Sequence, residues 1–423
     1  MRQPLFIIVD MGLLYNIGVS IYEAGIKLAA HSNNKARLWC EGRKDILDHI
    51  AERMASVKGR VVWLHAASLG EFEQGRPVIE RIRELMPEAV IVLTFFSPSG
   101  YEVRKNYPGA DHIFYLPSDK PSNVRRFLDA VHPDVAIFVK YEFWLNYLGE
   151  LRRRNVPTYL ISAIFRPSQI HFQPWGGIWR RALDSYNAIF VQDDRSRELL
   201  RGVGYDRSIV AGDTRFDRVA AIARAARRIE LIERFAMGKP LFVAGSTWGK
   251  DEELLIELIN RHPDIRFLIA PHEMDEARMK HLEASVNGGV VRYTRSANMS
   301  DFSGVQLMIL DTIGMLSSAY SYARWAYIGG GFGVGIHNTL EAATFGLPIA
   351  FGPNYHKFRE ACDMVELGAA HSVTSAKELE AWFEPLKSDG EPLQKVSSSA
   401  RSYTKEHCGA TDTIMGVIFP TAG

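Results

Sequence analysis

The stretch HAASLGEFEQGRP (65–77) contains a carboxylate, Glu71, between the end of a predicted strand and the start of a predicted helix. Glu71 follows the apolar run VVWLHA (61–66), and the small residues between them leave room for a substrate to approach. A carboxylate in the first turn of a helix complements the helix dipole, which would make Glu71 structural. A general base that removes a proton within hydrogen-bond reach is the other interpretation. The local sequence leaves both open.

A second carboxylate, Glu142, lies in KYEFW (140–144), directly after another predicted strand. Between Tyr141 and Trp144 it would orient a sugar or share a proton network, whereas an ion pair with Lys140 would make it structural. We keep both interpretations.

Arg215 lies in GDTRFDRV (212–219), close to the expected junction of two domains. A guanidinium there would stabilise negative charge that develops in a reaction. The structural alternative is a salt bridge with Asp213 or Asp217.

A glycine-rich stretch, GGGFGVGIHN (329–338), follows a predicted strand of the second half. Glycine lets backbone amides approach a ligand closely, but the spacing matches the dinucleotide fingerprint only loosely. A predicted helix begins in HNTLEAATFG (337–346), with Asn338 as its cap and Glu341 one turn inside. Helix N-termini attract phosphate, and a carboxylate there can accept bonds from ribose hydroxyls. We therefore expect a nucleotide across this helix start; an ordinary strand-to-helix turn is the alternative.

Two other strand ends of the second half carry polar groups. GSTW (245–248) offers backbone amides and the hydroxyls of Ser246 and Thr247, which suit an anion. His272, in APHEMDEAR (270–278), would contact a nucleotide, although a lone histidine is more often structural.

The elements that must position these residues alternate from residue 60 onward. Short apolar runs separated by amphipathic stretches predict parallel sheets covered by helices on both faces. The predicted strands are 61–66, 90–95, 134–139, 157–162 and 188–192, then 240–245, 266–271, 307–310, 325–330 and 347–352. A charged helical segment (218–235) separates the two sets. Ligands bind beyond the carboxyl ends of such strands, so we expect two α/β, doubly wound domains and one cleft that collects the polar segments.

Composition narrows the class of protein further. The chain has 423 residues, 47% of them hydrophobic, which is typical of a globular protein of two or three domains. With a net charge of +1, the chain has no overall positive potential that would attract nucleic acid. Three widely spaced cysteines fit a reducing compartment, and no histidine or cysteine set has the spacing of metal ligands.

The N-terminal stretch PLFIIVDMGLLYNIGVSIY (4–22) is mostly apolar. It approaches the length of a membrane span, although Asp10 would be costly at the bilayer centre. Basic residues between Lys27 and Lys44 favour keeping that side cytoplasmic. We expect a helix that anchors in a membrane or lies on it; a core helix packed on the first domain is the alternative.

The motifs, in their order and spacing, resemble the 3-deoxy-D-manno-octulosonic acid (Kdo) transferases of lipopolysaccharide synthesis. The resemblance covers most of the chain. It rests on KARLWCEGRKD, WLHAASLGE, KYEFW, GDTRFD, AGSTW, DTIGML and GGGFGVGIHNTLEAATFGLPIAFGPNYHKFREA.

The resemblance implies a GT-B glycosyltransferase, bound to the cytoplasmic face of the inner membrane. Residues 1–30 would form a membrane-associated helix, 31–215 an acceptor domain and 216–423 a CMP-Kdo domain whose last helix packs back on the first. The implied reaction transfers Kdo from CMP-Kdo to a lipid A precursor with inversion, without a metal or other cofactor.

The resemblance also implies roles for individual residues. Glu71 would be the general base, and Glu142 and Arg215 would stabilise the transition state. The family's CMP contacts fall on Pro271, His272, Ile313, Gly314, Met315, Asn338, Thr339, Leu340 and Glu341. The residue pattern described above adds Ser246, Thr247, Gly330, Gly331 and His337 to the residues expected at CMP-Kdo.

Three positions depart from the family's pattern. PHEMDEA (271–277) lacks a basic residue that the family usually has, and Met315 stands in place of a glutamate. Leu145 stands where proline is usual. The first two concern nucleotide binding, and none of the three affects the candidate glutamates.

Other functions remain open on the sequence. A UDP-sugar transferase or a nucleotide-sugar epimerase would share the architecture, and a lipid-binding protein without catalysis would share the fold alone. An NAD-dependent oxidoreductase is disfavoured, because the glycine-rich stretch does not lie in a first βαβ unit. The number of Kdo residues transferred and the oligomeric state are not fixed by the sequence.

Overall fold

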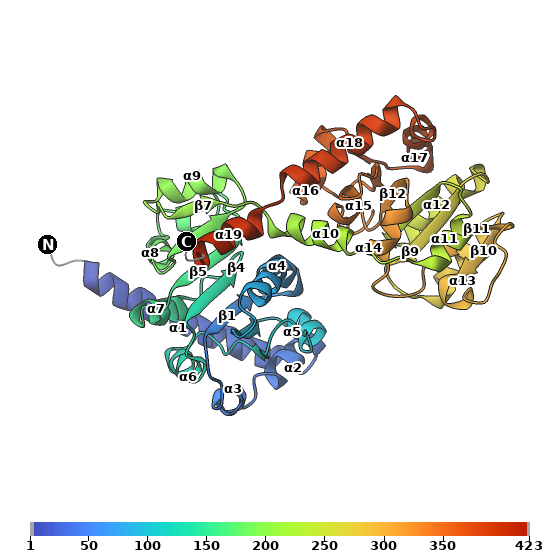
Figure 1. The fold of residues 1–423 in the computed structure, drawn as a ribbon. Helices are drawn as coiled ribbons and strands as arrows, with labels where there is room; N and C mark the ends of the chain where they lie inside the picture. The colour runs from blue at the N-terminus through green and yellow to red at the C-terminus, as the bar shows by residue number, and fades with distance from the viewer. Residues whose placement is uncertain (1–3, 421–423) are drawn as a thin grey trace. The chain divides into compact units, whose positions relative to one another are not determined.

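The structure, a computed structural model, describes residues 4–420, with side chains from residue 12 onward. It divides into two compact units (Figure 1). The first comprises the chain up to Arg218 and the segment from Cys408 on, and the second is Val219–His407. The boundary expected from the sequence, after residue 215, falls in the helix that joins them, α10 (Thr214–Arg224).

The first unit contains a seven-stranded parallel sheet in the order β3-β2-β1-β4-β5-β6-β7. The strands are β1 (Val61–Ala66), β2 (Val90–Phe95), β3 (His112–Tyr115), β4 (Val135–Val139), β5 (Thr158–Ala163), β6 (Ala188–Val191) and β7 (Ser208–Val210). The helices are α1 (Pro4–Ala29), α2 (Asn34–Glu41), α3 (Ile46–Met54), α4 (Leu69–Leu85), α5 (Pro98–Arg104), α6 (Pro121–Val131), α7 (Leu145–Arg153), α8 (Gly177–Leu183), α9 (Asp194–Gly202) and α19 (Ala410–Ile418), with a 3-10 turn, η1 (Ile170–Phe172).

Side chains of β1 alternate between two cores, because successive residues of a strand point to opposite faces. Trp63 packs with Phe127 of α6 and Tyr147 of α7 on one face. Leu64 packs with Phe72 of α4 on the other face. Helices therefore cover both faces, as the unbroken apolar strand runs predict.

The last helix belongs to the first unit, where Figure 1 shows α19 in red. Ile414 lies in the same core as Phe72. The Asp217 carboxylate accepts bonds from the backbone N–H groups of Gly409 (2.6 Å) and Thr411 (2.7 Å), and from the Thr411 hydroxyl (2.7 Å). Asp217 therefore caps the start of α19, and the apolar face of that helix completes the core.

The second unit contains a parallel sheet of the same size, in the order β10-β11-β9-β8-β12-β13-β14. The strands are β8 (Leu241–Thr247), β9 (Arg266–Pro271), β10 (Gly289–Arg292), β11 (Val305–Ile309), β12 (Trp325–Ile328), β13 (Ile349–Phe351) and β14 (Ala370–Ser372). The helices are α11 (Glu230–Ala236), α12 (Gly249–Arg261), α13 (Glu276–Ser285), α14 (Leu316–Ala319), α15 (Leu340–Ala343), α16 (Arg359–Glu366), α17 (Ala376–Phe383) and α18 (Glu391–Glu406), with 3-10 turns η2 (Tyr293–Arg295), η3 (Tyr320–Tyr322) and η4 (Glu384–Leu386).

The predicted single helix over 218–235 is wrong in detail. The structure breaks it between α10 and α11, at residues 225–229. Ile229 turns inward and is buried, and its backbone N–H donates to the Tyr322 hydroxyl at 2.6 Å. This tertiary bond replaces an intrahelical one at that position.

The N-terminal helix α1 contacts the first unit along one side. The Tyr15 hydroxyl donates to Asp119 at 2.5 Å, and Lys120 forms an ion pair with Glu23. Elsewhere the helix exposes large apolar side chains, namely Leu13, Leu14, Ile17, Ile21, Tyr22 and Leu28. The side chains of residues 4–11, Asp10 among them, lie outside the described part. Within that part, no helix combines the length and the apolar character needed to span a membrane.

Candidate active site

Glu71 lies in the first turn of α4, directly beyond β1. Its Oε2 accepts hydrogen bonds from the Ser68 backbone N–H (3.0 Å) and the Ser68 hydroxyl (3.3 Å). Oε1 forms no hydrogen bond among the described residues. Glu71 therefore caps the helix with one oxygen and keeps the other for a ligand, so the two interpretations from the sequence are compatible.

Glu142 is buried just beyond β4, with 5% of its surface exposed. Lys140 adopts a left-handed backbone conformation (φ +72°), which turns the chain sharply there. The Glu142 carboxylate accepts bonds from the His65 Nε2–H at 3.0 Å and from the Trp144 indole N–H. The Tyr186 hydroxyl donates to the Glu142 backbone carbonyl. His65 and Trp144 thus fix the carboxylate, and Tyr186 fixes the backbone of the same residue.

His65 is a site residue that the sequence reasoning missed. It is fully buried at the end of β1, and its Nδ1 lies 2.9 Å from the Thr94 hydroxyl and 3.1 Å from the Thr94 carbonyl. The Trp63 indole N–H donates to the same hydroxyl at 2.8 Å. A histidine that ends an otherwise apolar strand, beside the Glu71 loop, was the available signal.

The electrostatics of the first unit favour a base at Glu71. Burial raises the pKa of the Glu71 carboxyl above its ordinary value, and the negative charge of Glu142 raises it further. His65, Lys140 and the Ser68 hydroxyl act in the opposite direction, but the net pKa is raised. A raised pKa moves a carboxyl toward the range in which a general base works well near neutral pH.

Arg215 adopts the salt bridge that the sequence analysis kept as its structural alternative. Its Nε and a terminal guanidinium nitrogen each lie 2.8 Å from Oδ2 of Asp213. The Gln74 amide donates to the other Asp213 oxygen at 3.2 Å. The other candidate partner, Asp217, caps α19. A role for Arg215 in the transition state stays a prediction.

In the second unit, the end of β8 lies against the start of the glycine-rich loop. Ser246 has a left-handed backbone (φ +54°). A Cβ on Gly329 would lie 2.2 Å from the Ser246 carbonyl oxygen, so only glycine fits there. Gly330 also has positive φ (+92°), and its N–H donates to the buried Asp251 carboxylate at 2.9 Å.

Three rings stack beside this loop. His272 lies between Trp248 (ring centres 4.7 Å apart) and His337 (4.3 Å), with both pairs close to parallel. The Trp248 indole N–H donates to His337 Nε2 at 3.2 Å. Burial, and then the neighbouring His272, lower the pKa of His337, which keeps that ring neutral and able to accept this bond.

Glu341 joins two of the segments predicted to hold the nucleotide. Its carboxylate accepts bonds from the Ser317 hydroxyl (2.5 Å) and the Asn338 amide (3.0 Å). The Asn338 side-chain oxygen accepts from the Leu340 N–H at 3.1 Å, but the N-cap residue of the helix is Thr339, one position after the predicted cap. The helix that follows, α15, is shorter than the predicted one and has only four residues. A nucleotide phosphate at this helix start therefore has little helix dipole to attract it.

The other residues that are predicted to bind CMP-Kdo lie around these contacts. Pro271 ends β9, and the backbone N–H of His272 donates to the Thr247 carbonyl at 3.0 Å. Ile313 is 89% exposed, and Gly314 has φ +87° before Met315, the N-cap residue of α14. Gly331 packs against Gly352, and the buried Thr339 hydroxyl has no partner among the described residues. A single cleft for the residues of both units stays a prediction.

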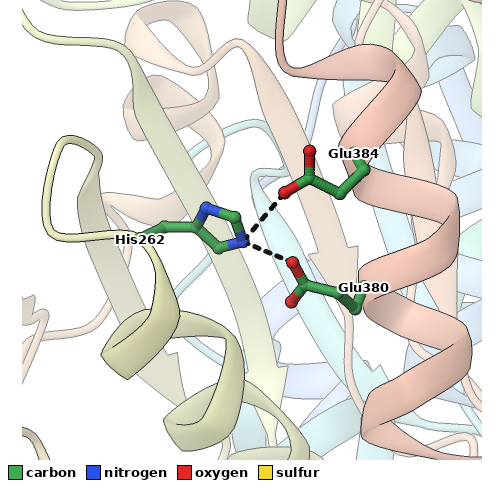
Figure 2. Close-up of side chains that lie close together, drawn as sticks. All are labelled: His262, Glu380 and Glu384. Carbon is green, nitrogen blue, oxygen red and sulfur yellow. Dashed lines mark hydrogen bonds and ion pairs between the residues drawn. The ribbon is translucent and has the colours of Figure 1, made fainter.

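One further cluster has the residue types of a metal site (Figure 2). His262 Nε2 lies 2.8 Å from Glu380 and 3.8 Å from Glu384. On the other side of the ring, the Lys387 ammonium donates to Nδ1 at 3.1 Å. Nδ1 is then an acceptor, so the proton sits on Nε2, whereas a metal-binding histidine usually donates from its other nitrogen. The cluster therefore fits a hydrogen-bond network that joins the end of α12 to α17.

Asp251 is a supporting residue that the sequence reasoning also missed. Besides the Gly330 N–H, it accepts bonds from the Trp248 N–H (2.9 Å) and the Tyr327 hydroxyl (2.8 Å).

We expect Asp251→Ala to lower the free energy of unfolding by about 3 kcal/mol, because three buried donors lose their acceptor. Asp251→Asn is the matched control and should cost about 1 kcal/mol or less, since an amide oxygen can serve the two N–H groups. Urea denaturation followed by circular dichroism checks this, and equal losses in both variants would contradict it.

Solved structures of UDP-N-acetylglucosamine 2-epimerases have a similar fold. One matches with a TM-score of 0.58 at 11% identity, covering 86% of this chain and 98% of that one. A putative enzyme of this name from Listeria monocytogenes gives the same score and the same coverage at 13% identity. Two Rossmann-like parallel-sheet units in one chain, with these neighbours, place the fold in the GT-B class.

Sequence comparisons point to one family. Residues 48–218 match the family model described as 3-Deoxy-D-manno-octulosonic-acid transferase (kdotransferase). Proteins named 3-deoxy-D-manno-octulosonic acid transferase match from Bordetella pertussis (29% identity, 83% of this chain and 85% of the relative), Haemophilus influenzae (25%, 85% and 86%) and Aquifex aeolicus (26%, 78% and 86%). Over most of its length the chain is therefore similar to the 3-deoxy-D-manno-octulosonic acid (Kdo) transferases.

Proposed function

We propose that this chain transfers Kdo from CMP-Kdo to a lipid A precursor in lipopolysaccharide core biosynthesis. Relatives of this name over most of its length support the activity. The mechanism rests on the environment of Glu71, which lies within the residues that match the family model. One of its carboxylate oxygens caps the start of α4 and the other is free among the described residues, and the pKa of the carboxyl is raised.

The proposed reaction is an inverting displacement with Glu71 as the base. A hydroxyl oxygen of the acceptor sugar attacks the anomeric carbon of Kdo, and its proton passes to Glu71. The bond from that carbon to the CMP phosphate oxygen breaks, and CMP leaves with the electron pair. Glu142 and His65 maintain the electrostatic environment of the base, because their buried pair lies beside it.

We assign the sugar donor, CMP-Kdo, to the second unit and the acceptor, the lipid A precursor, to the first. Backbone N–H groups of the glycine-rich loop other than that of Gly330, which donates to Asp251, are assigned to a phosphate, and the Glu341 carboxylate is assigned to ribose hydroxyls. The proposed steps are written without a cofactor.

We further propose that the protein works at the cytoplasmic face of the inner membrane, with α1 lying on the bilayer. The support is the set of large apolar side chains that α1 exposes, such as Leu13, Ile17 and Ile21. A helix with such a surface can bury it at the boundary between head groups and acyl chains.

Nucleotide competition tests the donor assignment. Purified protein would be assayed for Kdo transfer to an acylated lipid A precursor by mass spectrometry of the products. CMP should inhibit in proportion to its concentration, and UDP at equal concentration should not. Inhibition by UDP alone would instead favour a UDP-sugar enzyme of the same fold. The product masses also give the number of Kdo residues added.

A further inference from the structure

The first unit has an open cavity of about 510 Å³ whose wall is mostly aromatic. Helix α1 forms one side of it with Tyr15, Gly18 and Tyr22. Trp39, Phe96, Phe143, Trp144, Ile170 and Trp179 supply much of the remaining wall. Such a lining favours an apolar guest over a sugar or a nucleotide, because it offers few hydrogen-bonding groups.

The cavity reaches the candidate catalytic residues. Tyr141 and Glu142 belong to its lining, and Glu142 is close enough to Glu71 to raise the pKa of that base. On its other side, α1 exposes Leu13 and Ile17. The wall of the cavity and the apolar surface of the protein are thus two sides of one helix.

A buried histidine in this wall lacks hydrogen-bond partners. His171 is 4% exposed, and neither of its ring nitrogens is bonded among the described residues. Its neighbours are aromatic, with the Phe143 ring centre 4.2 Å away. Burial lowers the pKa of His171 to about 4, so the ring is neutral and offers one donor and one acceptor. Buried polar groups are normally satisfied, so this histidine indicates a missing ligand.

We propose that this cavity binds one acyl chain of the lipid acceptor, with His171 bonded to an oxygen of that chain. The proposal rests on the proposed function, since it assigns the lipid part of that acceptor. A methylene group fills roughly the 30 Å³ that one water molecule occupies in the liquid, so the cavity holds on the order of ten carbons. The apolar part of an acyl chain matches the aromatic wall of the cavity. The ester or amide oxygen near the head of the chain would accept a hydrogen bond from the unpartnered histidine.

Filling the cavity from α1 tests the proposal. A Cβ at Gly18 meets no atom within 4 Å, so Gly18→Phe places a ring in the cavity without a backbone clash. Gly25→Phe is the matched control, because Gly25 lies on the same helix, has the same open space and does not line the cavity. Both changes remove a helical glycine, so their effects on the helix itself are comparable.

The measured quantity is the preference for lipid, namely kcat/KM for the acylated acceptor divided by kcat/KM for the chemically deacylated acceptor. Gly18→Phe should lower this ratio at least tenfold, and Gly25→Phe should keep the wild-type ratio. An unchanged ratio in Gly18→Phe would overturn the acyl-chain proposal while the transferase function stands. Absence of transfer to either acceptor by the wild-type protein would overturn the proposed function itself.

Two substitutions of His171 separate ligand binding from folding. His171→Phe keeps an aromatic ring and removes an unsatisfied polar group, so the thermal midpoint of the free protein should stay equal or rise. Its KM for the acylated acceptor should rise at least fivefold. His171→Gln restores a donor and an acceptor and should recover part of that loss. A lower thermal midpoint in His171→Phe with an unchanged KM would show a purely structural histidine and would contradict the proposal.

Discussion

Glu71→Gln is expected to reduce the rate of Kdo transfer by about 10²- to 10⁴-fold, the usual contribution of a general base. The amide cannot accept the proton of the attacking hydroxyl. It can still accept the bond from the Ser68 N–H, because glutamine also serves at this position of a capping box. The free energy of unfolding should therefore change little. Single-turnover kinetics with saturating donor measures the loss at the chemical step.

Glu71→Ala separates the two roles of this residue. It removes the base and the cap together, so it should be as inactive as Glu71→Gln and also less stable by about 1 kcal/mol. CMP-Kdo binding, measured by calorimetry, should survive in both variants. Near-normal turnover in either variant would show that the base has been assigned wrongly.

The pH profile gives an independent check on Glu71. A general base must be ionised, so transfer falls as pH drops through its pKa. Burial and the charge of Glu142 raise the pKa of Glu71 above the ordinary value of 4.5. The acid limb of kcat/KM should therefore have its midpoint above pH 4.5. Glu142→Gln removes the neighbouring charge, so it should move that limb to lower pH.

The largest loss of stability is expected for Glu142→Ala, about 3–5 kcal/mol in the free energy of unfolding. The substitution leaves the buried Nε2–H of His65 and the indole N–H of Trp144 without their acceptor. It should also reduce transfer strongly, because the network beside Glu71 is lost. Urea denaturation measures the loss of stability, and initial rates under conditions where the variant stays folded measure the loss of transfer.

Glu142→Gln is the control for the hydrogen bonds. Both donors reach the same carboxylate oxygen, Oε2, so an amide oxygen in its place can accept from each of them. It should lose much less stability than Glu142→Ala. If the two variants unfolded at the same urea concentration, the hydrogen bonds would not be what holds this site together.

The central strands of both sheets were predictable because they are continuously apolar. β1, β2 and β9 have the predicted bounds, β4 begins one residue later than predicted, and β5 is displaced by one residue. The strands that the sequence reasoning missed are β3, β7, β10 and β14, and these are the four sheet edges. Edge strands are short and only partly buried, so their hydrophobic signal is weak.

The apolar pattern predicts the fold class and places Glu71 and Glu142 just beyond their strands, because it shows where the strands end. Only the tertiary structure decided their partners. His65 meets Glu142 across 77 positions of sequence, and Asp251 binds Gly330 across 79. The physical reason is that hydrophobic periodicity is local, whereas the partner of a buried polar group depends on which strands become neighbours in the sheet.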